Sequence, residues 1–128
     1  MNMDIGEVFV FGSNLAGRHG AGAAKQAVKY GARYGIGVGL QGDTYAIPTK
    51  DVNIKTLPLE DIKEFVDDFV LFSEDNKYLT FLVTRIGCGL AGYNDSDIAP
   101  MFVDCSSNVK FSSMWEEFLP CREYWTNL

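Results

Sequence analysis

Two short apolar runs, each followed by a cluster of glycines, constrain the fold of this chain more than any other feature. The first run is "EVFVFG" at residues 7–12, and the second is "YLTFLVTRIG" at residues 78–87. Runs that are apolar without polar alternation are typical of strands buried on both faces, as in parallel sheets. Because such a sheet needs helices over both faces, the two runs predict an α/β fold.

Helical patterns lie between the two runs. Residues 21–35, "AGAAKQAVKYGARYG", are rich in alanine and lysine and end in glycine, which is typical of a helix with a C-terminal stop. A second helix is predicted from Pro58, with acidic residues in its first turn and one apolar face. The apolar face consists of Ile62, Phe65, Val66, Phe69 and Phe72.

The rest of the chain continues the alternation of strands and helices. A glycine-rich loop at residues 35–43 leads to a predicted strand at residues 44–49. After the second apolar run, a short helix is predicted at residues 98–103 and a strand at residues 108–112. The helix content of the C-terminal segment, residues 113–125, is left open, so this segment stays unassigned.

A chain of 128 residues suits one compact core, so residues 1–128 are predicted to form a single domain. Alternating strands and helices predict a three-layer α/β/α sandwich with a mostly parallel central sheet. In such sheets, ligands bind beyond the carboxyl ends of the strands. Both glycine clusters follow strands, so we expect them to meet at that edge.

The first glycine cluster, "FGSNLAGRHGAGAA" at residues 11–24, matches no standard nucleotide motif. A Walker A loop is excluded because Arg18 and His19 stand where Lys and Ser/Thr belong. The dinucleotide fingerprint fails because Lys25 replaces its final glycine. A loop of small residues that leads into a helix can still bind a pyrophosphate through its N–H groups. The alternative is a tight turn without a ligand.

The second glycine cluster, "IGCGLAGY" at residues 86–93, follows the second apolar run. Together with "FGSN" and "HGAGAA", it resembles the macrodomain family, the ADP-ribose-binding module. The resemblance is closest to the branch that includes terminal ADP-ribose protein glycohydrolase, where a "GAG" loop, a "TK" strand end and an "IGCGL" loop follow in this order. The chain also looks like small macrodomain-like proteins of tailed phages and bacteria. The resemblance runs from Val8 to Phe111.

The resemblance implies that two glycine loops clamp the diphosphate of ADP-ribose in an α/β/α sandwich. It places Asn14 and Tyr93 beside the distal ribose; alternatively, Asn14 caps its own turn and Tyr93 is a core aromatic. The implied phosphate loops consist of Gly20, Ala21 and Gly22, and of Gly87, Cys88, Gly89, Leu90, Ala91 and Gly92.

Three residues are candidates for catalysis. Lys50, in "YAIPTKD", matches the catalytic lysine of that branch, where a lysine could attack the anomeric carbon or stabilise its leaving group. His19, the only histidine, is a candidate acid, base or phosphate donor. The branch has an aspartate after "IGCGL", where this chain has Ala91. Asp95 is a nearby acid that could replace this carboxylate, although capping the following helix is its ordinary role.

Charge is unevenly distributed along the sequence. The net charge of −6 argues against general nucleic-acid binding, which needs surplus Lys and Arg. From Val8 to Gly42, however, the chain has no acidic residue. Lys25, Lys29 and Arg33 lie four residues apart and are expected to form one stripe on the first helix.

Composition limits the remaining functional classes. No apolar run approaches the roughly 20 residues that cross a bilayer, and the acidic N-terminus does not resemble a signal peptide. We therefore expect no membrane association and a cytoplasmic location, the host cytoplasm if the protein is phage-encoded. The widely spaced Cys88, Cys105 and Cys121 predict reduced thiols. We expect no metal site and no cofactor.

Three functional hypotheses follow. The first is an enzyme that binds ADP-ribose and hydrolyses an ADP-ribosyl linkage on a macromolecule, or ADP-ribose 1″-phosphate. The second is an ADP-ribose-binding module without turnover, which Ala91 motivates. The third is a protein-interaction adaptor whose glycine loops are only turns.

Overall fold

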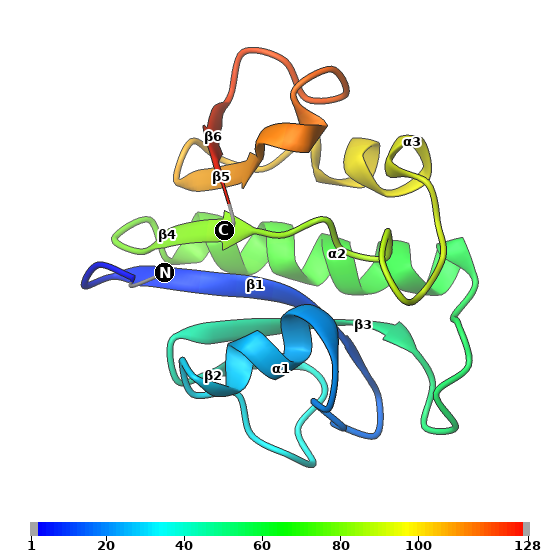
Figure 1. Cartoon of the computed structure of the whole chain (residues 1–128). Coiled ribbons are helices and arrows are strands. Elements are labelled where there is room, and N and C mark those ends of the chain that lie inside the picture. Colours follow the sequence, from blue (N-terminus) through cyan, green and yellow to red (C-terminus); the bar gives the residue numbers. More distant parts are fainter. Residues whose placement is uncertain (1–2, 127–128) are drawn as a thin grey trace.

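The computed structural model describes residues 3–126, so the first two and last two residues of the predicted domain lie outside the described part. Within it, six strands form one sheet in the order β2-β3-β1-β4-β5-β6 (Figure 1). All neighbouring strands pair in parallel except β2 and β3. The strands are β1 (Glu7–Asn14), β2 (Gly39–Gln41), β3 (Thr44–Lys50), β4 (Thr80–Val83), β5 (Val109–Ser112) and β6 (Glu123–Trp125).

Helices lie on both faces of this sheet, which confirms the predicted three-layer α/β/α sandwich (Figure 1). The α-helices are α1 (Gly22–Val28), α2 (Leu59–Asp75) and α3 (Asp95–Ile98), and the 3-10 helices are η1 (Ala99–Phe102) and η2 (Ser113–Trp115). On the α1 side, Phe9 and Phe11 pack in a small core with alanines. Val8 and Val10 belong to the larger core beneath α2. This alternation follows from the two-residue period of a strand.

Most of the predicted apolar face of α2 is buried in the structure. Ile62, Val66 and Phe69 are fully buried, whereas Phe65 and Phe72 are only half-buried at the edge of the face. The Phe69 ring lies within 5.1 to 6.0 Å of three other aromatic rings, measured between centroids. Aromatic contacts at these separations stabilise a core beyond the area that they bury.

The first helix is shorter than predicted. It ends at Val28 instead of continuing to Gly35, because the chain turns at Gly31, whose φ is +114°. A Cβ at this position would lie 2.8 Å from the Cα of Gly42, so the turn needs glycine. Arg33 therefore lies outside α1, and the predicted stripe of three basic residues along one helix is wrong.

Two further predictions need correction at the ends of the sheet. Strand β2 lies inside the predicted glycine-rich loop and runs antiparallel to β3. The unassigned C-terminal segment contains η2 and β6, which extends the sheet beyond β5. The predicted helix at residues 98–103 instead consists of α3, which begins at Asp95, and η1. Across residues 3–126, none of the helices has the length and apolar content needed to span a membrane.

Candidate ligand-binding site

The order of strands places a crevice beyond the carboxyl ends of β1 and β4. After β1 the chain passes through α1 toward β2 and β3 on one side, and after β4 it continues to β5 and β6 on the other side. Adjacent parallel strands whose connections diverge in this way open a crevice where α/β proteins bind ligands. The first glycine loop, residues 15–21, and the second glycine loop, residues 84–94, both lie at this crevice.

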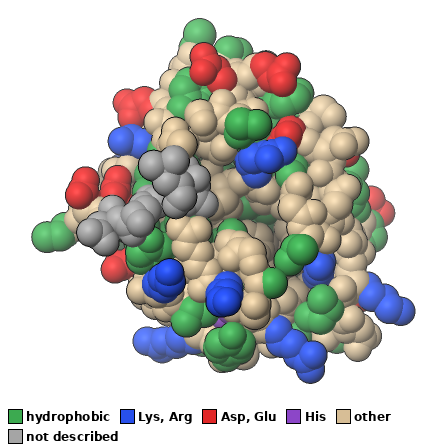
Figure 2. All heavy atoms as spheres, in the orientation of Figure 1, with side chains coloured by type: hydrophobic (Ala, Val, Ile, Leu, Met, Phe, Trp, Pro, Cys, Tyr) green, Lys and Arg blue, Asp and Glu red, His purple; other side chains and the backbone are tan. Residues whose placement is uncertain are grey.

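A cavity of about 860 Å³ occupies this edge of the sheet. Its wall is built from the ends of β1 and β3, parts of both glycine loops, the start of α1, η2 and the end of β6. Figure 2 shows the molecule hollowed on this face, with Lys and Arg side chains beside the hollow. The volume lies in the upper part of the roughly 300–1,000 Å³ that small-molecule sites occupy.

The cavity is basic although the protein is acidic. Arg18, Lys50 and Arg85 line it, and no Asp or Glu does so within residues 3–126. The net charge of the whole chain is −6, so the acidic residues are concentrated elsewhere. A concave surface lined by charge of one sign raises the local concentration of oppositely charged ligands. The cavity therefore favours an anion.

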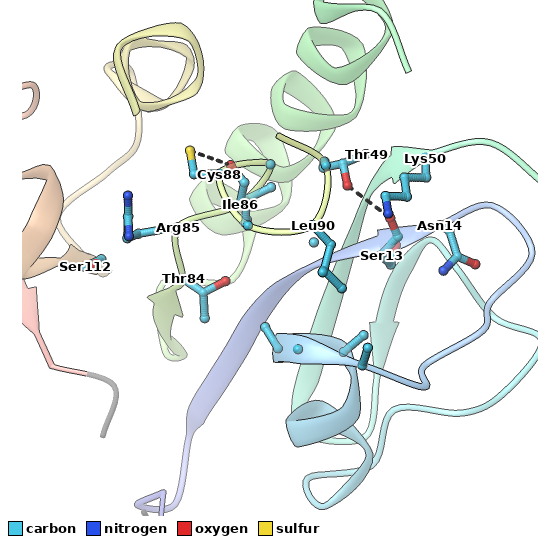
Figure 3. A pocket seen from close by; sticks show the side chains of 18 of the residues that line it. Ser13, Asn14, Thr49, Lys50, Thr84, Arg85, Ile86, Cys88, Leu90 and Ser112 are labelled. Carbon is cyan, nitrogen blue, oxygen red and sulfur yellow. Dashed lines mark hydrogen bonds between the residues drawn. The ribbon is translucent and has the colours of Figure 1, made fainter. Parts of the chain in front are cut away.

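Both loops bring backbone donors to the cavity wall. Within the described chain, the amides of Gly20, Ala21 and Gly22 and those of Gly89, Leu90 and Ala91 donate to no protein acceptor. A Cβ added at Gly22 would lie 3.8 Å from Cδ1 of Leu90, so the two loops face each other. Figure 3 shows Leu90 extending from the second glycine loop toward α1. Unpaired amides on two facing loops form a suitable surface for phosphate oxygens.

Most of the residues that sequence motifs assigned to ligand binding line this cavity. They are Asn14, Gly20, Ala21, Gly22, Gly87, Cys88, Gly89, Leu90 and Ala91, together with Lys50. Gly92 and Tyr93 are not part of its lining. The Tyr93 hydroxyl donates to the carbonyl oxygen of Leu57 at 2.6 Å, and its ring packs against the larger core. Tyr93 thus joins the second glycine loop to the start of α2.

Asn14 both lines the cavity and shapes the first glycine loop. Its Oδ1 accepts from the amide of Arg18 at 2.9 Å, and its Nδ2 donates to the carbonyl of the same residue at 2.8 Å. This is the turn-capping role that the sequence allows as the alternative to a ribose contact. In the pairing of β1 with β3, Asn14 lies opposite Lys50, and Figure 3 shows both on one side of the cavity.

His19 lies behind the first glycine loop rather than in the cavity wall. Its side chain is fully buried, and its Nε2–H donates to the carbonyls of Arg33 at 2.8 Å and Ile36 at 3.1 Å. The imidazole packs edge-on against Phe11, with ring centroids 5.4 Å apart. His19 therefore connects the first glycine loop to residues 33–36, and a ligand in the cavity does not reach it.

Asp95 also lies outside the cavity lining and acts on a residue that does line it. Its carboxylate accepts from Nε of Arg85 at 2.9 Å and from Nη2 at 2.7 Å, and the Trp115 indole donates to it at 2.7 Å. The hydrogen bond from Arg85 lowers the pKa of Asp95. Asn94, not Asp95, caps α3. Asp95 therefore fixes the Arg85 guanidinium at the cavity wall.

Cys88 is half-buried in the second glycine loop, and its Sγ–H donates to the carbonyl of Ile86. Burial, followed by the negative charge of Asp95, raises the pKa of the Cys88 thiol to about 12. Because the thiolate is the reactive form of cysteine, the raised pKa disfavours reaction of Cys88 at neutral pH.

No sequence motif marks the residues at the two ends of the cavity. Ile54 lines it near β3, and Met114 and Trp125 line it near β6. Met114 lies in η2, directly after β5, whereas Trp125 reaches the cavity through the pairing of β6 with β5. No group of three or more His, Cys, Asp or Glu side chains suited to a metal ion occurs within residues 3–126.

Comparison with known proteins gives information about the fold only. No protein-family model and no curated protein matches the chain. A solved structure of a protein of unknown function from Bacteroides thetaiotaomicron is similar, with a TM-score of 0.59 and 14% sequence identity. The similarity covers 82% of this chain and 85% of that chain. At this identity the likeness concerns the arrangement of helices and strands.

The placement of His19 predicts a structural role. His19→Leu keeps a similar volume but removes the N–H shared by the carbonyls of Arg33 and Ile36. Each carbonyl keeps a second donor, the amide of Ile36 for Arg33 and the side-chain amide of Gln41 for Ile36. Loss of the His19 donor should therefore lower the free energy of unfolding by about 0.5–1.5 kcal/mol, measured by urea denaturation. Tyr78→Phe is the control, because Tyr78 is 81% exposed and should contribute little. Equal stability of His19→Leu and the wild type would contradict the structural role.

The raised pKa of Cys88 predicts slow alkylation. At pH 8, iodoacetamide should modify the exposed Cys121 well before Cys88, because Cys88 has almost no thiolate at that pH. Peptide mass spectrometry of a time course gives both rates in one sample. Modification of Cys88 at a rate equal to that of Cys121 would show that its thiol is not suppressed.

Proposed function

We propose that this chain binds ADP-ribose, or a derivative of it, with the diphosphate between the two glycine loops. The observation that carries the proposal is that two facing, cavity-lining loops present amides without protein acceptors in the described chain. Such N–H groups bind phosphate oxygens without requiring a basic protein. The resemblance of both loops to the macrodomain family supports ADP-ribose as the particular diphosphate.

The shape of the cavity supports a ligand with a central diphosphate and a group at each end. The two glycine loops follow the neighbouring strands β1 and β4, whereas Lys50 ends β3 and Trp125 ends β6. At about 4.8 Å per strand spacing, β3 and β6 lie roughly 19 Å apart. Trp125 and Met114 offer apolar surface for a planar base at one end. The sugar beyond the diphosphate then lies beside Asn14 and Lys50.

Isothermal titration calorimetry with ADP-ribose tests this proposal directly. Saturable binding supports it, and absence of binding at millimolar ligand rejects it. The adaptor hypothesis instead predicts that no nucleotide raises the melting temperature. The unpaired amides and the acid-free basic cavity weigh against that hypothesis, because a turn without a ligand requires neither.

Gly89→Ala separates ligand binding from folding. A Cβ at Gly89 meets no atom within 4 Å, and the backbone there is not in the left-handed region, so the melting temperature should stay at the wild-type value. Because Gly89 lines the cavity, the added methyl group should hinder close approach of the diphosphate to the backbone and weaken ADP-ribose binding at least about tenfold, or about 1.4 kcal/mol. The control is Ser96→Ala, an exposed position near the second glycine loop and outside the cavity lining. Unchanged affinity in Gly89→Ala would place the diphosphate elsewhere.

Hydrolysis at Lys50 is a second candidate function. Lys50 lines the cavity at the sugar end, is only half-buried and forms no ion pair among the described residues. An unprotonated Lys50 amine could attack the anomeric carbon while the bond to the leaving group breaks, and water would then release ADP-ribose. Since no described carboxylate lines the cavity, a ligand phosphate or water must accept the proton. The missing carboxylate favours the binding module without turnover as the alternative.

Lys50→Ala tests the catalytic candidate. Wild-type protein should release product from an ADP-ribosylated protein or from ADP-ribose 1″-phosphate, and Lys50→Ala should lower that rate at least about 100-fold. Lys55→Ala is the matched control, because Lys55 is an exposed lysine nearby in the chain and does not line the cavity. If wild-type protein binds ADP-ribose but releases no product from either substrate, the chain is a binding module.

A further inference from the structure

Ile54 combines a cavity-lining side chain with an unfavourable backbone conformation. Its φ is 62°, in the left-handed region that favours glycine and asparagine. For a β-branched residue this conformation is an outlier, because both Cγ atoms crowd the backbone. Within residues 3–126, Cys121, with φ of 61°, is the one other non-glycine residue with positive φ, and it does not line the cavity.

Hydrogen bonds of a short hairpin impose this conformation. The amide of Ile54 donates to the carbonyl of Asp51 at 3.1 Å, and the amide of Asp51 donates to the carbonyl of Lys55 at 2.8 Å. Oδ1 of Asp51 also accepts from the amides of Asn53 and Lys55. Ile54 occupies the bulge position of this hairpin, where glycine is the usual residue. The fold therefore requires the backbone geometry at residue 54 but not an isoleucine side chain.

Core packing does not explain why position 54 has an isoleucine side chain. Ile54 is 37% exposed, and it is not among the described apolar residues that pack against either core cluster. It lines the cavity together with Lys50, which is four residues earlier. The hydroxyl of Thr56 donates to the carbonyl of Ala91 at 3.1 Å and so holds the hairpin against the second glycine loop.

We infer that Ile54 is a ligand-contact residue whose side chain packs on the terminal ribose of ADP-ribose. This inference rests on the proposed function, which places that sugar beside Lys50. A strained conformation that the surrounding hydrogen bonds over-determine is characteristic of ligand-binding positions. The apolar side chain covers the C–H face of the sugar, while polar groups at the same end of the cavity meet its hydroxyls. Ile54 thereby distinguishes ADP-ribose from ADP, which lacks this sugar.

Two substitutions at residue 54 and one control test the inference. Ile54→Gly and Ile54→Asn keep the left-handed backbone and remove the apolar side chain. Cys121→Gly relieves the same kind of strain outside the cavity. The measurements are the melting temperature without ligand and the calorimetric affinities for ADP-ribose and for ADP.

Both Ile54 variants should melt at or above the wild-type temperature, because strain is relieved and little core packing is lost. Their affinity for ADP-ribose should fall at least about tenfold, as for the loss of methylene groups from an apolar contact, while their affinity for ADP stays unchanged. Cys121→Gly should leave both affinities unchanged.

Other outcomes overturn the inference in distinguishable ways. Wild-type affinity for ADP-ribose in both Ile54 variants, or an equal loss for ADP-ribose and ADP, rejects Ile54 as a contact to the sugar and leaves the proposed function intact. A melting temperature below wild type in both variants shows that the side chain serves folding. If wild-type protein binds neither ligand, the proposed function and this inference fail together.

Discussion

Strand β1 is hydrogen-bonded along both edges, to β3 through residues 9–14 and to β4 through residues 7–10. Its side chains supply both cores, with Phe9 on the α1 side and Val10 on the α2 side. The positions of the other elements follow from this strand, because β3 and β4 can only add to its two edges and the helices must cover its two faces. The cavity lies beyond the end of β1, because the connections that follow β1 and β4 lead to opposite sides of the sheet.

The first glycine loop keeps its shape because another glycine-rich segment packs against it. A Cβ at Gly37 would lie 2.0 Å from the carbonyl oxygen of Asn14, so the segment after α1 must have glycine at this position. The hydroxyl of Ser13 donates to the carbonyl of Gly37, and His19 holds residues 33–36 from the other side. The glycines between α1 and β2 thus support the site and do not line it.

Sequence patterns predicted the elements that depend on local composition. The two apolar runs became β1 and β4, and the period of apolar residues gave the buried face of α2. The edge strands β2 and β6 escaped prediction because each has only three residues and lacks a buried alternation. These strands form because β3 and β5 each have an edge free for pairing, and the sequences of β2 and β6 themselves do not reveal this.

Part of the candidate site was also predictable from sequence patterns. Glycine motifs identified both loops, because backbone approach to a ligand leaves a direct trace in the sequence. Motifs give the neighbours of a residue along the chain but not the direction of its side chain. His19 and Tyr93 lie within the motifs, yet their side chains point into the protein. Ile54 and Trp125 belong to segments without a motif, and only tertiary structure brings them to the cavity.

Helix α2 lies on the face of the sheet opposite α1, and its charge should affect the association rate of an anionic ligand. Helix α2 contains seven acidic residues and one lysine, a net charge of −6, which equals the net charge of the whole chain. The acid-free stretch from Val8 to Gly42 includes α1 on the other face. The molecule is therefore an electric dipole that repels an anion approaching α2 and attracts one approaching the cavity side. Association should slow as salt is added, because ions screen this field beyond roughly 10 Å at 0.1 M.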